Sequence, residues 1–194
     1  METHPFSPFF PDDAKVLILG TFPSLDHRGF YYTSPKNLMW PIFEKIFNKT
    51  LSCGVNWDIC AIKNLCEQKG IALCDVGLII GRKKGSSSDK NLIYAQELDL
   101  KKMLSEYLPK CTTVLCTGED VYKHVSKQFG VSKQDSFVMT IKNREVTFVE
   151  AYSTSGRNNP IFQKVLDDYH AKLSSARVVI PRRCTNNMNQ NEPL

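Results

Sequence analysis

The hydrophobic positions of the chain form short apolar runs separated by longer amphipathic stretches. Uninterrupted apolar runs are typical of strands that are buried on both faces, and the chain has three, at 15–20, 71–80 and 112–116. Apolar residues at helical spacing predict helices at about 38–47, 56–69, 96–107, 118–128 and 160–173. The apolar segments 137–141 and 145–151 predict either a hairpin that turns at Asn143 and Arg144, or an added strand beside a fourth core strand.

Strands that alternate with helices predict a sheet covered by helices on both faces. We therefore expect an α/β fold of three layers, α/β/α, around a central, mainly parallel sheet of four to five strands. A chain of 194 residues fits one domain, which we place at 1–176, followed by a polar C-terminal tail at 177–194. Ligands of such sheets bind beyond the carboxyl ends of the strands, so the loops that follow the predicted strands carry the candidate chemistry.

Composition restricts the function classes without selecting one. No apolar run is long enough to span a membrane, and the first residues lack the basic start and apolar core of a secretory signal. The seven cysteines contain no C-x-x-C pair, which disfavours a zinc ribbon or a redox dithiol and indicates reduced thiols in an intracellular compartment. The net charge of +5 is compatible with a polyanionic partner.

The longest predicted loop, 21–37, follows the first strand and is rich in aromatic residues. It holds Phe30, Tyr31 and Tyr32 in succession, and aromatic faces stack on extruded bases for roughly 1–3 kcal/mol per base. These rings can instead belong to the core, although three in a row cannot all point inward from a loop. Asn37 precedes the next helix, where it is a candidate site residue and equally an ordinary helix cap.

Two further loops combine small, hydroxylated and basic residues, which suit contacts with phosphates. The loop 82–89 is one, although a solvated flexible loop explains it equally well when it is taken alone. The other, 153–159, holds Gly156 and Arg157 before a helix, which suits either phosphate binding or helix capping. Asp75 lies inside an apolar strand, and because a buried carboxylate needs a partner, it faces either a ligand or a structural hydrogen bond.

In their order along the chain, these segments resemble the uracil-DNA glycosylase superfamily, and most of all its hypoxanthine-DNA (deoxyinosine) glycosylase branch. The resemblance covers roughly residues 4–172 and is carried by the segments 16–24, 29–32, 35–41, 70–76, 85–92 and 153–158. It implies the fold of that superfamily. It also implies a monofunctional DNA glycosylase of base-excision repair, which flips a deaminated base, hypoxanthine or uracil, and hydrolyses its N-glycosidic bond without a metal or cofactor.

The resemblance also implies a role for each matched residue. Phe22 stands where most members carry a catalytic Asp or Asn, and the branch uses the downstream Asn, which is Asn37 here. Asp75 stands where the superfamily places a base-reading Asn, and its carboxylate can accept from the N1–H of hypoxanthine, with O6 left to backbone amides near Thr21 and Phe22. The other base-binding candidates are Gly20, Phe30, Tyr31 and Tyr32. The candidates for DNA contact are Ser24, Lys83, Lys84, Ser86, Ser153, Ser155, Gly156, Arg157 and Asn158.

Departures from the family pattern leave other function classes open. Many members carry a His in the last motif, where this chain has Ser153-Thr-Ser, and none of the four histidines, His4, His27, His124 and His170, lies at a motif position. An alternative is a catalytically inactive nucleic-acid or nucleotide-binding module on the same scaffold, and a third is an unrelated α/β enzyme acting on a small nucleotide. The expected partner is DNA with a damaged base, bound by a monomer without a membrane or an obligate protein partner, in the cytoplasm or a eukaryotic nucleus.

Overall fold

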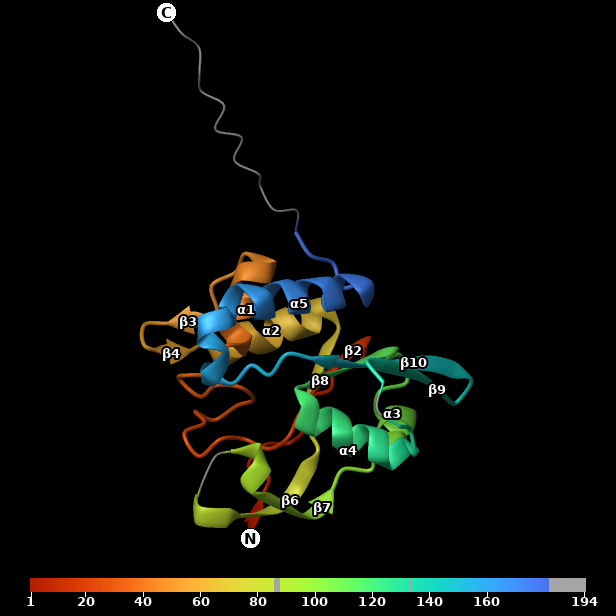
Figure 1. Cartoon of the computed structure of the whole chain (residues 1–194). Coiled ribbons are helices and arrows are strands. Elements are labelled where there is room, and N and C mark those ends of the chain that lie inside the picture. The colour runs from red at the N-terminus through yellow and green to blue at the C-terminus, as the bar shows by residue number, and fades with distance from the viewer. Residues whose placement is uncertain (86–87, 133, 182–194) are drawn as a thin grey trace, which may run out of the picture.

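A computed structural model describes residues 1–85, 88–132 and 134–181 (Figure 1). Its central sheet has five strands in the order β5-β2-β8-β10-β9. The strands are β2 (Val16–Gly20), β5 (Ile71–Asp75), β8 (Thr113–Thr117), β9 (Ser136–Ile141) and β10 (Arg144–Ala151). The strands β5, β2, β8 and β10 are parallel, and β9 is antiparallel to β10. This confirms the predicted α/β fold with a mainly parallel sheet of four to five strands.

Helices cover both faces of this sheet because alternate residues of each buried strand point to opposite faces. Val16 and Ile18 of β2 join a buried cluster with α1, α2 and α5, whereas Leu17 and Leu19 join one with α3 and α4. The helices are α1 (Met39–Phe47), α2 (Ile59–Lys69), α3 (Leu100–Glu106), α4 (Glu119–Phe129) and α5 (Phe162–Ser175). Figure 1 shows α1, α2 and α5 on one side of the sheet and α3 and α4 on the other, as the three-layer prediction required.

The apolar run 71–80 is two strands rather than one. After β5 the chain leaves the central sheet, and β6 (Gly77–Arg82) pairs with β1 (Glu2–Thr3) and β7 (Leu92–Glu97) in a separate antiparallel sheet. The break falls at Val76, which is itself buried, so the apolar pattern does not show it. Helical turns η1 (Lys83–Gly85) and η2 (Asp89–Asn91) lie in the predicted loop that follows.

Other boundaries differ from the prediction because short elements precede the helices. A small hairpin, β3 (Ser52–Cys53) and β4 (Asn56–Trp57), occupies the predicted start of α2, and a turn η3 (Gly156–Ile161) leads into α5. The hairpin between β9 and β10 turns at Lys142 and Asn143, whose φ angles of 45° and 64° are those of a two-residue hairpin turn. Both alternatives for this region therefore hold, since β10 is the fourth parallel strand and β9 is the added edge strand.

Candidate functional site

The carboxyl ends of the parallel strands open onto one cavity of about 490 Å³. In the strand register Gly20 lies opposite Asp75, so the ends of β2 and β5 meet at its floor, next to Thr117 of β8. This volume lies within the range of roughly 300–1,000 Å³ that is typical of small-molecule sites. The cavity is lined by the loop after β2, by Asp75 and by the segment 153–157, so the three regions singled out by the sequence converge.

Most of the predicted site residues line this cavity. They are Gly20, Thr21, Phe22, Ser24, Tyr31, Tyr32, Asn37, Asp75, Ser153, Ser155, Gly156 and Arg157. Phe30 does not line it, because its ring is buried in the core against Phe9 and Tyr31. Lys83 is exposed outside the cavity lining, and the Asn158 side chain donates to the carbonyl oxygen of Ser153 over 2.7 Å instead of lining the cavity. Ser86 and the side chain of Lys84 lie outside the described parts of the chain.

The Phe22 wall of the cavity is held in place by Arg82. The Arg82 guanidinium lies 5.3 Å from the centre of the Phe22 ring and donates to the carbonyl oxygen of Pro23 over 2.6 Å. Its Nε donates to the Glu2 carboxylate at 3.0 Å. Because this side chain is only 4% exposed, Arg82 fixes the loop after β2 from behind rather than contacting a phosphate from the surface.

Asn37 serves the fold and the cavity together. Its Oδ1 accepts from the backbone N–H of Met39 at 2.9 Å, in the first turn of α1. A backbone N–H can donate to the oxygen of the Asn37 amide but not to its nitrogen, so this bond identifies which atom is Oδ1 and which is Nδ2. The two interpretations of Asn37, helix cap and cavity residue, therefore apply at once, and the bond holds the side chain in one orientation beside the cavity.

The segment 153–157 rests directly on the loop that carries Asn37. Leu38 N–H donates to the carbonyl oxygen of Thr154 over 2.8 Å. At Gly156 a Cβ would lie 2.5 Å from the carbonyl oxygen of Lys36 and 2.8 Å from its Cβ. Only a glycine permits this approach of the two backbones, so the position of Asn37 depends on Gly156.

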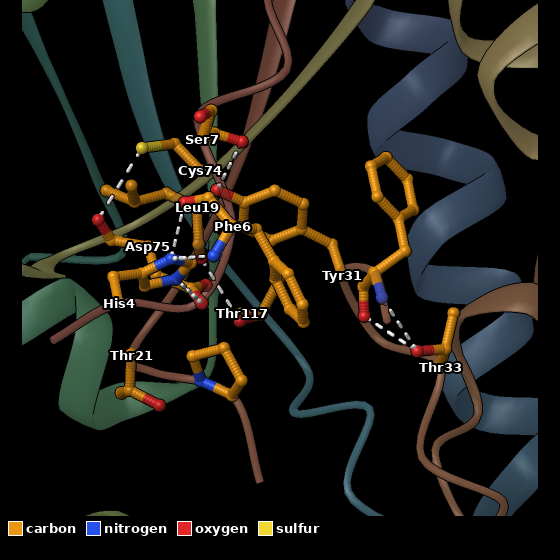
Figure 2. Close-up of polar contacts among 12 residues, drawn as sticks. His4, Phe6, Ser7, Leu19, Thr21, Tyr31, Thr33, Cys74, Asp75 and Thr117 are labelled. Carbon is orange, nitrogen blue, oxygen red and sulfur yellow. Dashed lines mark hydrogen bonds and ion pairs between the residues drawn. The ribbon is translucent and has the colours of Figure 1, made fainter. Parts of the chain in front are cut away.

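His4 supports the site from behind although it does not line the cavity, and the sequence analysis did not single it out. Its Nε2 lies 3.0 Å from Asp75 Oδ2, and its Nδ1 lies 2.8 Å from the Phe6 carbonyl oxygen and 3.1 Å from the Phe6 nitrogen (Figure 2). The imidazole is 8% exposed and stacks on Tyr31, with ring centres 5.5 Å apart. The pairing of β1 with β6 brings this residue to the end of β5, and a strand of two residues leaves no detectable sequence pattern.

Asp89 and His27 also line the cavity without having been singled out. Thr21 Oγ1 donates to Asp89 Oδ1 over 2.5 Å. Burial raises the pKa of the Asp89 carboxyl above its ordinary value, and the Thr21 hydrogen bond only partly offsets this. The His27 ring lies edge-on to Phe6, with centres 4.9 Å apart. Asp89 is the last residue of the loop 82–89, which the sequence analysis interpreted as suited to phosphates. A carboxyl that lines the cavity disfavours phosphate binding at this end of the loop.

The charges around the cavity are divided between its mouth and its interior. Lys36 and Arg157 are exposed cations on the lining and Asp26 is an exposed carboxylate, whereas Asp75 is buried. Among the described residues no group of three or more His, Cys, Asp or Glu could hold a metal ion. No helix in the described ranges is long and apolar enough to cross a membrane.

No protein-family model and no curated protein matches the chain. A similar solved structure is the solution NMR structure of a protein from Methanosarcina acetivorans, described as "a putative Uracil DNA glycosylase". The two are 18% identical, the match covers 89% of this chain and 96% of that chain, and the TM-score is 0.65. The chain has a uracil-DNA glycosylase-like fold. In this uracil-DNA glycosylase-like fold the cavity lies at the carboxyl edge of the sheet, where open α/β sheets bind ligands.

Proposed function

We propose that the protein is a DNA glycosylase that takes a deaminated base, hypoxanthine or uracil, out of the DNA stack and hydrolyses its N-glycosidic bond. The observation that carries this proposal is the convergence of Asn37, Asp75 and the segment 153–157 on one cavity of about 490 Å³. The fold likeness supports the same class of enzyme. The sequence resemblance favours the hypoxanthine branch. Position 22, where most members carry a catalytic Asp or Asn, is Phe22 here, and the downstream Asn that the branch uses is Asn37.

The mouth of the cavity offers suitable contacts for the DNA backbone. Ser24, Ser153 and Ser155 present hydroxyls there, and Lys36 and Arg157 present cations, which are the groups that usually bind phosphates. Extruding a base costs a few kcal/mol, and least at a lesion, which contributes selectivity. We infer that the turn at Gly156 and Arg157 fills the gap in the stack, while the exposed Arg157 side chain contacts a neighbouring phosphate.

Asn37 would position the water that attacks C1′. Its Oδ1 has a second lone pair after accepting from Met39, and the fixed side chain needs no reorganisation to hold a water. As the glycosidic bond breaks, its electron pair leaves with the base, and the water adds to the cationic C1′ and loses a proton to solvent.

The test is single-turnover base release from duplexes that contain inosine or uracil. We expect Asn37→Ala to slow release by about a hundredfold or more, which is the scale of a misplaced reacting group. Asn37→Ser is the matched control for the fold, because Ser also caps helices. It should melt close to the wild type and still lose release. A folded variant with an unchanged rate would remove Asn37 from the mechanism.

Asp75 gives a second, independent measurement of the same proposal. A carboxylate only accepts hydrogen bonds, whereas an amide both donates and accepts. Asp75→Asn should therefore shift the preference of the enzyme toward uracil, measured as the ratio of release rates from inosine and uracil duplexes. An unchanged ratio would mean that Asp75 does not contact the base.

A lesion-binding module without hydrolysis is the second candidate. Phe22 at the usual catalytic position and Ser153-Thr-Ser in place of a His favour it. Binding of lesion-containing or abasic duplexes, with no base release from inosine, uracil or xanthine, would decide for this module and against the glycosylase.

A further inference from the structure

The floor of the cavity is shaped by the absence of a side chain at Gly20. A Cβ at this position would lie 2.2 Å from Asp75 Oδ1 and 2.8 Å from the Tyr32 hydroxyl oxygen. Both oxygens therefore face the same point at the end of β2, and all three residues line the cavity. A carboxylate oxygen and a phenolic hydroxyl lie side by side where a base edge would arrive.

The Asp75 carboxylate has a fixed role as an acceptor. His4 Nε2 occupies its Oδ2 at 3.0 Å, which leaves Oδ1 toward Gly20. The Phe6 backbone offers His4 Nδ1 a carbonyl oxygen at 2.8 Å and an N–H at 3.1 Å, so the ring keeps a partner there whether or not that nitrogen is protonated. With His4 Nε2 at Oδ2, the carboxylate presents its other oxygen, Oδ1, as an acceptor.

The Tyr32 hydroxyl is a donor without a partner. Its oxygen is buried and makes no hydrogen bond of ordinary geometry within the described part of the chain, although the Thr117 hydroxyl lies close enough to lower its pKa in part. The neighbouring Thr117 hydroxyl donates to the Leu19 carbonyl oxygen over 3.1 Å (Figure 2). Burial and the nearby Asp75 carboxylate raise the pKa of the Tyr32 hydroxyl well above its ordinary value, so it keeps its proton at neutral pH. A buried unpaired hydroxyl costs stability, roughly 1–3 kcal/mol, and requires an explanation.

The backbone around Tyr32 is held in an unfavourable conformation that aims this hydroxyl. Its φ angle is 57°, in the left-handed region that non-glycine residues rarely adopt. The neighbouring residues fix it there: Trp40 Nε1 donates to the Tyr31 carbonyl oxygen over 3.0 Å, and Thr33 Oγ1 donates to the Phe30 carbonyl oxygen over 2.7 Å. Strain of this kind is typical of functional sites.

We propose that Asp75 and Tyr32 together read the lactam edge of the base, with Asp75 Oδ1 accepting its N–H and the Tyr32 hydroxyl donating to the adjacent carbonyl oxygen. Hypoxanthine presents N1–H beside C6=O, and uracil presents N3–H beside C4=O. Adenine and cytosine present the reverse, an unprotonated ring nitrogen beside an amino group. The pair would thus accept hypoxanthine and uracil and reject their parents, adenine and cytosine, whereas guanine and thymine share the lactam edge and must be excluded by other contacts. This inference rests on the proposed function and makes Tyr32 its specificity-determining residue.

The experiment separates reading of the base from hydrolysis. Duplexes carry a 2′-fluoro nucleoside, which resists cleavage, with hypoxanthine, with adenine, or with unsubstituted purine, which lacks both lactam groups. Dissociation constants are measured for the wild type, for Tyr32→Phe and for Tyr94→Phe. The last is the matched control, because the Tyr94 hydroxyl is likewise buried without a hydrogen bond in the described part of the chain but lies outside the cavity lining.

We expect the wild type to prefer hypoxanthine over both other bases. Tyr32→Phe should reduce the preference for hypoxanthine over purine by about tenfold, the scale of one hydrogen bond, and should melt at or above the wild-type temperature because an unpaired hydroxyl is gone. Tyr94→Phe should keep the preference.

Two results would overturn the inference: an unchanged preference in Tyr32→Phe, or a wild type that binds all three duplexes equally. Equal weakening on all duplexes would also count against it, because it indicates a purely structural role. The two proposals fail separately. A wild type that selects hypoxanthine without releasing it refutes only the glycosylase, whereas release that Tyr32→Phe leaves equally selective refutes only the lactam reading.

Discussion

Replacing Gly156 by alanine tests whether the contact between two backbones sets the catalytic geometry. The added Cβ would lie 2.5 Å from the carbonyl oxygen of Lys36 and 2.8 Å from its Cβ. Ordinary contacts of carbon begin at roughly 3.5 Å, so the two segments would have to separate by about 1 Å. Neither atom lies at the free end of a flexible side chain, and the segment 153–157 or the loop of Asn37 must therefore move.

The size of the effect follows from that displacement. A misplacement of about 1 Å at a reacting group lowers the rate by roughly a hundredfold, and overpacking destabilises by about 1–3 kcal/mol. We therefore expect Gly156→Ala to slow single-turnover base release by about a hundredfold under conditions where it remains folded. Leu38 N–H would also lose or lengthen its bond to Thr154, now 2.8 Å.

The assay compares base release and thermal melting of Gly156→Ala with those of Gly81→Ala. At Gly81 the nearest atom to an added Cβ is 3.5 Å away, and the residue lies on β6 outside the cavity lining, so this variant should match the wild type. If Gly156→Ala releases base and melts like the wild type, the reasoning is refuted. A lower melting temperature with an unchanged rate of base release would show that the contact stabilises the fold but does not set the catalytic geometry.

Three further predictions concern charged groups. His4→Phe should destabilise the protein by about 1–3 kcal/mol in urea unfolding because Asp75 loses its donor, and His4→Gln should recover much of this; a larger loss in His4→Gln than in His4→Phe would show that the ring packing and not the hydrogen bond matters. Because burial raises the pKa of Asp89 in the folded state, the folded protein binds more protons, and its stability should fall as the pH rises from below 3.8 through that raised pKa. Asp89→Asn should remove this fall, so its gain in melting temperature over the wild type should be larger at pH 7 than at pH 4; a constant difference would contradict it. Arg157→Ala should weaken duplex binding and reduce its salt dependence by about one unit of slope, as expected for one lost phosphate contact; an unchanged slope would exclude that contact.

The central sheet could be predicted because its signal is local. Each residue of β2 is buried, and a continuous apolar run shows this directly. The boundary between β5 and β6 could not be predicted, because Val76 is as buried as the strands that it separates. At Phe30 the choice between core and cavity depends on which way the loop turns, which neighbouring residues do not reveal.

The sequence predicted which segments line the cavity but not which residues hold those segments in place. Asn37, Asp75 and the segment 153–157 follow the strand ends, where the topology brings loops together. His4 lies far from Asp75 in sequence, and only the pairing of β1 with β6 joins them. The sequence marked Gly156 only as part of a phosphate-binding or helix-capping loop, and the backbone of Lys36 that packs against it is a tertiary contact.

The position of β1 has a practical consequence for biochemical work on this protein. Glu2 holds Arg82, and His4 holds Asp75, so the first few residues support residues around the cavity without lining it. A purification tag fused at this end, or a shortened form lacking these residues, would disturb base recognition while leaving the five-stranded sheet intact. Recombinant protein for the assays above should carry its tag after the last residue, and loss of activity in an amino-terminally modified sample should be traced first to His4.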